Sequence, residues 1–345
     1  MRMISFAFHS PRVLFGAGSL SHLEREIELL GARRALVLST PHRRAADDIK
    51  RRLAGRCAGI FDGAVMHVPI EVASAAREEA RRLDADCAIA VGGGSTIGLA
   101  KAIALESGLP ILAIPTTYSG SEMTPVFGIT EGGQKKTGRD VRVLPRTVIY
   151  DPAVIAPLPP KIAAMSGMNA IAHGCEGLYA ENVAPVHALL AEEGIRALAG
   201  GLPGDGERCL YGAWLCGLVL AGAAMGLHHK LCHTLGGTFN LPHAETHAAV
   251  LPHALAYNQS AAPEAMRRIA AALNAKEAPS GVYDLARRLG ASMALRDLGM
   301  PESGLDRAAE MATMQPYPNP RPLERRAVRQ LLQDAWEGRR PGGSV

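Results

Sequence analysis

The first part of the chain alternates short apolar runs with amphipathic stretches. The apolar runs are aliphatic and end in Gly, Pro, Ser or Thr; they cover 35–40 (ALVLST), 87–95 (CAIAVGGGS), 110–117 (PILAIPTT) and 147–152 (TVIYDP). Between them, segments 45–55 and 96–108 have helical periodicity. This β-α-β rhythm predicts a parallel sheet with helices on both faces, a class of fold in which ligands bind at the carboxyl ends of the strands.

After about residue 153 the pattern becomes helical, with few candidates for strands. The periodic segments are 159–180, 186–202, 210–237 and 262–275. Prolines limit regular structure between 150 and 160, so we expect the domain boundary there. The prediction is an α/β domain at 1–153 followed by an all-α domain at 154–345.

Composition narrows the class of protein. The 345 residues include 20% charged residues and carry a formal net charge of +4, which is too small to predict nucleic-acid binding. Six cysteines are scattered without a C-x-x-C pair, which favours a reducing compartment. No segment reads as a signal peptide or reaches membrane-spanning length, so we expect a cytoplasmic protein that binds no membrane. The apolar stretch 217–226 suits a core or an interface; core is favoured, and a homodimer is the candidate assembly.

Two loops carry a candidate nucleotide site. Gly92, Gly93, Gly94 and Ser95 follow a strand and open a helix, where the backbone can approach a pyrophosphate closely. A ligand-free turn is the alternative. The next strand ends in a hydroxyl-rich loop, whose side chains either contact a ligand or cap the following helix: Thr116, Thr117, Ser119 and Ser121. Together the two loops favour dinucleotide binding, and they make 1–153 the dinucleotide-binding domain.

The strand at 35–40 bears on the choice of cofactor. Many NAD-specific enzymes place an acidic residue at the strand end that meets the adenosine ribose. Here Ser39 and Thr40 occupy that end, with Arg43 and Arg44 close behind. NADPH is therefore acceptable as well as NADH, although the two arginines also suit a solvated helix start.

Histidines at regular spacing mark a second site. Asn169 and His173 are four apart in helical sequence, as are His229 and His233, and His243 follows a proline. Residues four apart project from one face of a helix, so this set resembles a metal site. Asn is, however, a neutral and weak metal ligand. The remaining nearby histidines suit either a surrounding layer or the surface: His228, His247 and His253.

These blocks together resemble the iron-containing (group III) alcohol dehydrogenase family. The resemblance is carried by GGGSTIGLAKAIA (92–104), IPTTYSGSEMTP (114–125), GMNAIAHGCE (167–176) and the histidine-rich segment 228–253. It implies the dehydroquinate synthase-like fold, with a dinucleotide-binding domain and a helical catalytic domain that carries the metal. The family's Asp and three His ligands fall on Asn169, His173, His229 and His243, and His233 matches its histidine near the nicotinamide.

Asn in place of Asp, with segments 135–152 and 315–323, resembles the maleylacetate reductase branch of this family. The resemblance implies reduction of a small dicarboxylate, maleylacetate, by NADH or NADPH during aromatic-compound degradation. We expect no catalytic metal, because without the carboxylate the histidines can be charged or can donate hydrogen bonds to a dianion. Lys136, Lys135 and Arg139 are candidates for binding substrate carboxylates, and His233 is the first candidate for proton donor.

Three alternatives remain on the sequence alone. A metal-dependent (Fe or Zn) alcohol or polyol dehydrogenase of the same family could use three histidines and a water. A lyase resembling dehydroquinate synthase would need the metal that the missing carboxylate disfavours. A redox-cofactor sensor without catalysis would have no chemical need for the histidines.

Overall fold

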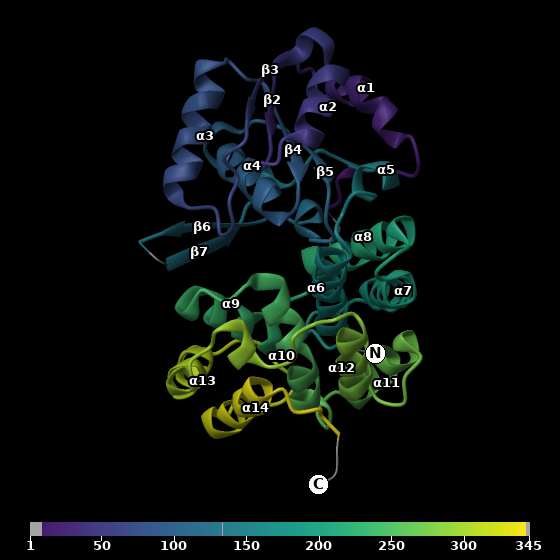
Figure 1. Ribbon diagram of the computed structural model, residues 1–345, viewed down its shortest axis with the longest axis vertical. Helices are drawn as coiled ribbons and strands as arrows, with labels where there is room; N and C mark the ends of the chain where they lie inside the picture. The colour runs from purple at the N-terminus through teal and green to yellow at the C-terminus, as the bar shows by residue number, and fades with distance from the viewer. Residues whose placement is uncertain (1–8, 133, 343–345) are drawn as a thin grey trace. The chain divides into compact units, whose positions relative to one another are not determined.

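The computed structural model describes residues 9–132 and 134–342, which form two units, 9–158 and 159–342 (Figure 1). The division lies a few residues after the expected boundary at 153/154, because the short helix α5 (Pro152–Ile155) is tied to the first unit. The Asp151 carboxylate accepts hydrogen bonds from the amides of Ala153 and Leu20.

The first unit, hereafter the sheet unit, contains a six-stranded parallel sheet in the order β1-β8-β5-β4-β2-β3. The strands are β1 (Arg12–Phe15), β2 (Ala35–Leu38), β3 (Cys57–Phe61), β4 (Cys87–Gly92), β5 (Ile111–Pro115) and β8 (Thr147–Tyr150). The four predicted strands are confirmed as β2, β4, β5 and β8. The sequence analysis missed β1 and β3, which are the two edges of the sheet and are less buried than the central strands.

Helices cover both faces of this sheet, as predicted (Figure 1). They are α1 (Leu23–Leu29), α2 (Arg44–Arg52), α3 (Ile70–Arg82) and α4 (Gly94–Ser107). Val37 and Ile89 point to one face, where they share a core with Ile27 of α1 and Ile49 of α2. Alternate strand residues point to the other face, where α4 packs on β4 and β5, with α3 beside it.

A two-stranded antiparallel hairpin completes the sheet unit. It comprises β6 (Val126–Glu131) and β7 (Gln134–Arg139). The sequence analysis missed it because β7 is polar and charged (QKKTGR) and carries no apolar alternation. Short 3-10 turns are found at Ser19–His22, Ala54–Arg56, Ser121–Met123 and Val141–Val143.

The second unit, hereafter the helical unit, contains helices and no strand among its described residues. The helices are α6 (Pro160–Leu178), α7 (Pro185–Gly201), α8 (Gly206–Gly222), α9 (Leu227–Phe239), α10 (His243–Asn258), α11 (Pro263–Leu273), α12 (Ala278–Arg288), α13 (Leu305–Thr313) and α14 (Arg325–Glu337), with 3-10 turns at Leu295–Leu298 and Glu302–Gly304. Together with the sheet unit, this confirms the predicted fold class.

Helix α6 is the buried centre of one layer of the helical unit. A Cβ on Gly174 would lie 2.9 Å from Ile195 of α7, and one on Gly177 would lie 2.0 Å from Val219 of α8. Only glycine permits so close a packing of helices there. Leu218 and Val219 are themselves buried inside the chain, so the apolar stretch 217–226 contributes to the core, as favoured.

No single helix in the described ranges is long and apolar enough to cross a membrane. Helices α8 and α9 satisfy that test only when joined, across a bend of 94°. The six cysteines are free, and five of them are buried.

Candidate active site

The glycine-rich turn lies where β4 meets α4. β4 ends at Gly92, Gly93 follows, and α4 begins at Gly94. A Cβ on Gly92 would lie 2.3 Å from Oγ1 of Thr96, and one on Gly93 would lie 2.7 Å from Oγ1 of Thr117. No side chain fits at either position, so bare backbone faces the start of a 14-residue helix. The positive end of a helix dipole favours an anion at such a place.

The hydroxyl-rich loop lies beside this turn, as the sequence predicted. β4 and β5 are neighbours in the sheet, and the Thr116 amide donates to the Gly92 carbonyl over 3.1 Å. The Thr117 side chain lies beside the place where a Cβ on Gly93 would be. The Ser119 side chain lies 3.5 Å from the position of a Cβ on Gly94. The structure therefore brings Gly92, Gly93, Gly94, Ser95, Thr116, Thr117 and Ser119 to one edge of the sheet.

Hydrogen bonds within the protein hold several of these hydroxyls. Ser119 Oγ donates to the buried Glu122 carboxylate over 3.0 Å, and Ser121 lies at the start of the 3-10 turn that follows. Ser39 is buried at the end of β2, where its hydroxyl donates to the Thr40 carbonyl. These contacts orient the loops around the turn.

Lys101 anchors the hydroxyl-rich loop, a role that sequence analysis missed. Its side chain is fully buried in α4, and Nζ donates to the carbonyls of Ser121, Thr124 and Val126 over 2.7 to 2.8 Å and to Thr124 Oγ1 over 2.9 Å. Burial lowers the pKa of Lys101 to about 7, while the nearby Glu122 acts to raise it. Tyr150 donates to the same Glu122 carboxylate over 2.7 Å.

Arginine at the start of α2 has partners of its own. Arg43 lies 3.4 Å from Asp47 on the same helix and 3.4 Å from Asp62, which follows β3. Both partners are half-exposed, so the pairing is a surface one. It fits the reading of Arg43 as a solvated helix start.

Three helices of the helical unit supply the predicted histidine cluster. α6 supplies Asn169 and His173; α9 supplies His228, His229 and His233; α10 supplies His243 and His247. The ring centroid of His229 lies 5.2 Å from that of His173 and 5.1 Å from that of His247. The ring centroids of His243 and His247 lie 4.3 Å apart. The predicted set thus forms one cluster, and the side chains of Asn169, His173 and His229 are buried in it.

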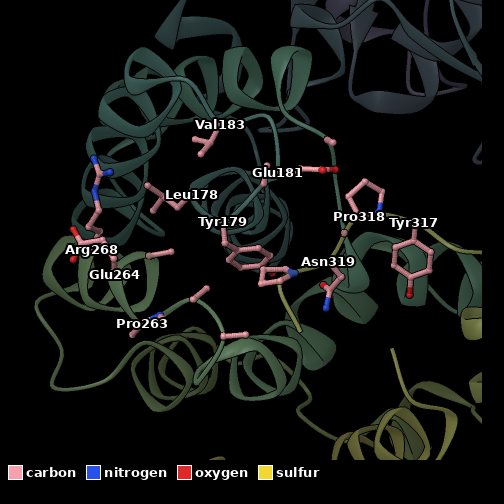
Figure 2. Close-up of a pocket in the computed structure, with 17 residues that line it drawn as sticks. Leu178, Tyr179, Glu181, Val183, Pro263, Glu264, Arg268, Tyr317, Pro318 and Asn319 are labelled. Carbon is pink, nitrogen blue, oxygen red and sulfur yellow. The ribbon is translucent and has the colours of Figure 1, made fainter. Parts of the chain in front are cut away.

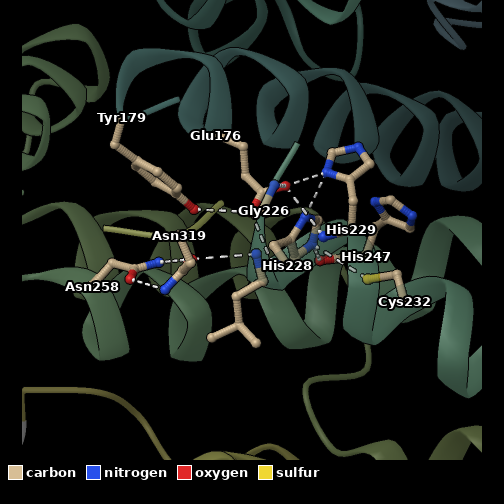
Figure 3. A network of polar contacts seen from close by, with 10 residues as sticks. Glu176, Tyr179, Gly226, His228, His229, Cys232, His247, Asn258 and Asn319 are labelled. Carbon is tan, nitrogen blue, oxygen red and sulfur yellow. Dashed lines mark hydrogen bonds and ion pairs between the residues drawn. The ribbon is translucent and has the colours of Figure 1, made fainter. Parts of the chain in front are cut away.

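Glu176 joins this cluster to the start of α9 (Figure 3). It follows Asn169 by seven residues and His173 by three on α6, and its side chain is fully buried. One carboxylate oxygen accepts from His229 Nδ1 over 2.5 Å. Burial acts to raise the pKa of Glu176, but the hydrogen bond and charge of His229 and the His228 amide bring it down to about 2. The carboxylate is therefore ionised.

Burial keeps several of the imidazoles neutral. It lowers the pKa of His173 well below the ordinary value, and the neighbouring rings lower it further. Burial likewise lowers the pKa of His228 to about 4 and that of His247 well below its ordinary range. Without a bound anion, a positive charge on His173 is therefore disfavoured, because a buried ring among other rings has no water to stabilise its charge.

Several buried polar atoms of the cluster have no hydrogen-bond partner among the described residues. They are Asn169 Oδ1, His173 Nδ1, His229 Nε2 and both ring nitrogens of His247. Buried polar atoms without partners are unusual in a folded protein and indicate a place for a ligand.

A metal would not find the family's ligand set here. Across the described residues, one group of three His, Cys, Asp or Glu side chains has ligand atoms within 4.8 Å of one another: His228, His229 and His247. His228 Nε2 donates to the His247 carbonyl, and His229 Nδ1 donates to Glu176. This trio includes neither His173 nor His243, and position 169 offers a neutral amide. The donors present therefore do not fit a site of one carboxylate and three imidazoles.

Other predicted residues lie at the edge of the cluster or outside it. His233 is exposed one turn beyond His229, with ring centroids 6.3 Å apart. His253 is buried further along α10. Lys136 is exposed on β7 and pairs with Glu131 of the same hairpin, so nothing in the structure supports its predicted catalytic role. Arg139 is exposed on that strand, and the Lys135 side chain lies outside the described residues.

A cavity of about 730 Å³ opens elsewhere in the helical unit (Figure 2). Its wall includes Tyr179, Gly226 and the segment 317–320, with Arg268 paired to Glu192 at one side. None of the described residues that line it is a histidine. We therefore do not assign the reaction to this cavity.

Comparison with known proteins places this arrangement in a family. Residues 10–152 match the iron-containing alcohol dehydrogenase profile, and residues 163–336 match the C-terminal profile of the Fe-containing alcohol dehydrogenase family. The chain belongs to the iron-containing alcohol dehydrogenase family, a family of oxidoreductases. This confirms the family and the fold that the sequence blocks indicated.

Within this family, the chain is more similar to some members than to others. Maleylacetate reductase from Burkholderia cepacia is 59% identical, over 99% of this chain and 100% of its own length. The crystal structure of maleylacetate reductase from Agrobacterium tumefaciens is 48% identical, with a TM-score of 0.94, and covers 99% of this chain and 100% of its own. A crystal structure of 1,3-propanediol oxidoreductase is 27% identical, with a TM-score of 0.90, over 97% of this chain and 100% of its own. The chain is thus much more similar to the reductases.

Proposed function

We propose that this enzyme reduces maleylacetate to 3-oxoadipate with NADH or NADPH. One observation carries the proposal: the buried cluster that the reductase-like sequence builds offers imidazoles and an amide where the family pattern has a carboxylate. The relatives that are maleylacetate reductases match nearly the whole chain, at 49 to 59% identity.

The chemistry of this substrate suits such a cluster. Maleylacetate carries a carbon–carbon double bond conjugated to a ketone, with a carboxylate at each end. The reduced dinucleotide supplies a hydride to the alkene carbon furthest from the ketone. The C=C π electrons then move to the ketone oxygen as an enolate, and the neighbouring carbon takes a proton. The protein must stabilise that oxygen and deliver the proton.

The cluster provides groups for both tasks. The unpartnered nitrogens of His173 and His229 can bind a ketone oxygen or a carboxylate once they carry a proton. A bound dianion favours that proton, because an opposite charge nearby stabilises imidazolium. The Asn169 amide can donate to a carboxylate, which an ionised aspartate could not. We keep His233 as the candidate proton donor, because it is exposed one turn from His229.

In the sheet unit, the glycine-rich turn and the hydroxyl-rich loop suit the dinucleotide. Gly93 leaves room for a pyrophosphate at the N-terminus of α4, and Thr117 stands beside it. Ser39 at the end of β2 places no negative charge near a 2′-phosphate, so both cofactors are accepted.

We further propose that catalysis needs no metal. The cluster offers a neutral amide at 169, and of the three imidazoles that come within 4.8 Å of one another among the described residues, His229 alone belongs to the family pattern. The enolate oxygen is then stabilised by hydrogen bonds alone.

Steady-state assays with purified protein test these proposals. Maleylacetate should be reduced with both NADH and NADPH, and simple alcohols or aldehydes should react far more slowly. Metal analysis, with activity measured before and after chelation, should show turnover that is independent of bound iron or zinc. Stoichiometric metal whose removal abolishes turnover would refute the metal-free mechanism, and preference for simple alcohols would favour a dehydrogenase.

A further inference from the structure

Glu176 is buried far more completely than an unpaired carboxylate tolerates. Its exposure is 0%, and its two oxygens accept from five donors. Oε1 accepts from the His228 amide over 2.9 Å and from the Tyr179 hydroxyl over 3.2 Å. Oε2 accepts from the amides of Gly226 and His229, each over 3.2 Å, and from His229 Nδ1 over 2.5 Å.

These donors place the carboxylate at the N-terminus of α9. Three of them are backbone amides at the first turn of that helix, which would otherwise have no partner. The helix dipole there favours a negative charge. One side chain from α6 therefore fixes both the start of α9 and the ring that projects from its first turn (Figure 3).

The contact also determines which nitrogen of His229 carries hydrogen. Both oxygens of Glu176 already accept from backbone amides, so the carboxylate also accepts at its contact with His229, and the nitrogen 2.5 Å away is Nδ1–H. The other nitrogen, Nε2, is buried and has no partner among the described residues. His229 thus presents Nε2 to the cluster, beside the ring of His173 at 5.2 Å between centroids.

We propose that Glu176 is a positioning residue for the reaction: it holds the Nδ1–H of His229, so that Nε2 points into the cluster and takes the proton with which it binds the substrate. This role rests on the proposed function. Glu176 does not touch the substrate, and it acts through His229. Carboxylates that orient a functional imidazole in this way typically matter by tenfold or more.

Nitrogen-15 NMR of histidine-labelled wild-type protein provides a test that needs no turnover. With the His229 signals assigned from a His229→Asn variant, we expect a proton on Nδ1 in the substrate-free enzyme. A neutral ring with its proton on Nε2 would overturn the proposal, whatever the enzyme reduces. Absence of maleylacetate reduction with the Nδ1–H signal intact would instead count against the proposed function alone.

Two substitutions at Glu176 test the consequence for catalysis. Glu176→Gln keeps the volume but loses the charge and one acceptor, and we expect kcat to fall about 30-fold with KM for maleylacetate within threefold. Glu176→Asp keeps the charge on a shorter side chain and should recover part of the loss. If the Gln variant does not fold, the Asp variant and the wild-type spectrum still decide the matter.

Asn319→Ala is the matched control for a merely structural role. Asn319 Oδ1 accepts from the Leu227 amide at the same helix start, and among the described residues the side chain hydrogen-bonds to Leu227, Asn258 and Arg321 rather than to His229. We expect a lower melting temperature, a kcat within threefold of wild type, and unchanged His229 signals. Equal losses of kcat in the Asn319 and Glu176 variants, with unchanged His229 signals in both, would show that Glu176 only supports the fold.

Discussion

Replacing Lys101 by Met should weaken dinucleotide binding without altering the histidine cluster. The ammonium group of Lys101 is the common donor for three carbonyls and one hydroxyl of the segment 121–126. That segment continues the hydroxyl-rich loop, which lies beside Gly93. Methionine fills a similar volume but donates no hydrogen bond, so the carbonyls of Thr124 and Val126 lose the Lys101 donor. The Ser121 carbonyl keeps the Thr124 amide as a donor, and Thr124 Oγ1 keeps the Val126 amide.

The expected size of the effect follows from these contacts. Each buried acceptor left without a donor costs about 1 to 3 kcal/mol. Relief from burying an ammonium group offsets part of that sum, so we expect a net loss of about 1 to 3 kcal/mol. Because each ~1.4 kcal/mol of lost loop order lowers apparent affinity tenfold, KM for NADH should rise about tenfold.

Urea unfolding and steady-state kinetics measure the two consequences. The midpoint should fall and KM for NADH should rise, while kcat at saturating NADH stays within threefold. Thr124→Val leaves Lys101 in place but removes the hydroxyl, which accepts from Lys101 and the Val126 amide and donates to the Ser121 carbonyl, and should cost about 1 to 2 kcal/mol. Lys50→Met, at an exposed position of α2, should change neither quantity. A lower midpoint with an unaltered KM would show that Lys101 stabilises the sheet unit without shaping the cofactor site.

Three further substitutions test other parts of the structure. Gly93→Ala places a Cβ 2.7 Å from Thr117 Oγ1, so NADH binding followed by fluorescence should weaken about tenfold or more, whereas Gly55→Ala, which meets open space, should bind normally. Asn169→Asp should raise the affinity for Zn²⁺ or Fe²⁺ in a calorimetric titration; no gain would mean that another feature excludes the metal. Burial lowers the pKa of His253 to about 4 from an ordinary 6.5, so its contribution to stability is complete above pH 6.5 and is lost as pH falls to 4. Between pH 6.5 and pH 4 the free energy of unfolding of the wild type should fall by roughly 3 kcal/mol more than that of His253→Gln. Parallel plots of unfolding free energy against pH for the two proteins would disprove this.

The sequence predicted the parts of the fold that are most buried. The central strands β2, β4 and β5 are continuous aliphatic runs because both faces of a parallel sheet are covered. Edge strand β3 contains Gly59 and is half-buried, so its pattern is weaker. The hairpin strand β7 is polar throughout, and pairing with β6 defines it more than any periodicity of its own.

The residues of the site likewise fall into those that the sequence predicted and those that it did not. Glycines and histidines are recognisable from their spacing, but Lys101 and Glu176 are charged residue types that normally face water. The sequences of their helices nevertheless indicate that these two residues are buried. Helices α4 and α6 are apolar around most of their circumference, and such helices lie inside a protein. A charged residue in the middle of a buried helix must have partners, and most of these partners come from segments 20 to 53 residues away.

The amide at 169 makes sense when the charge of the substrate is counted. An aspartate there without a metal would oppose each carboxylate of maleylacetate with roughly 3 kcal/mol at about 5 Å and an effective dielectric constant near ~20. That repulsion corresponds to a loss of affinity on the order of 100-fold, which a divalent cation would normally cancel. Burial lowers the pKa of His173 and of His247, so an aspartate at 169 would have no charged imidazole beside it to offset its charge, and Asn169 removes the repulsion. Under the proposed metal-free mechanism, selection for a dianionic substrate and independence from metal are two consequences of this one uncharged side chain.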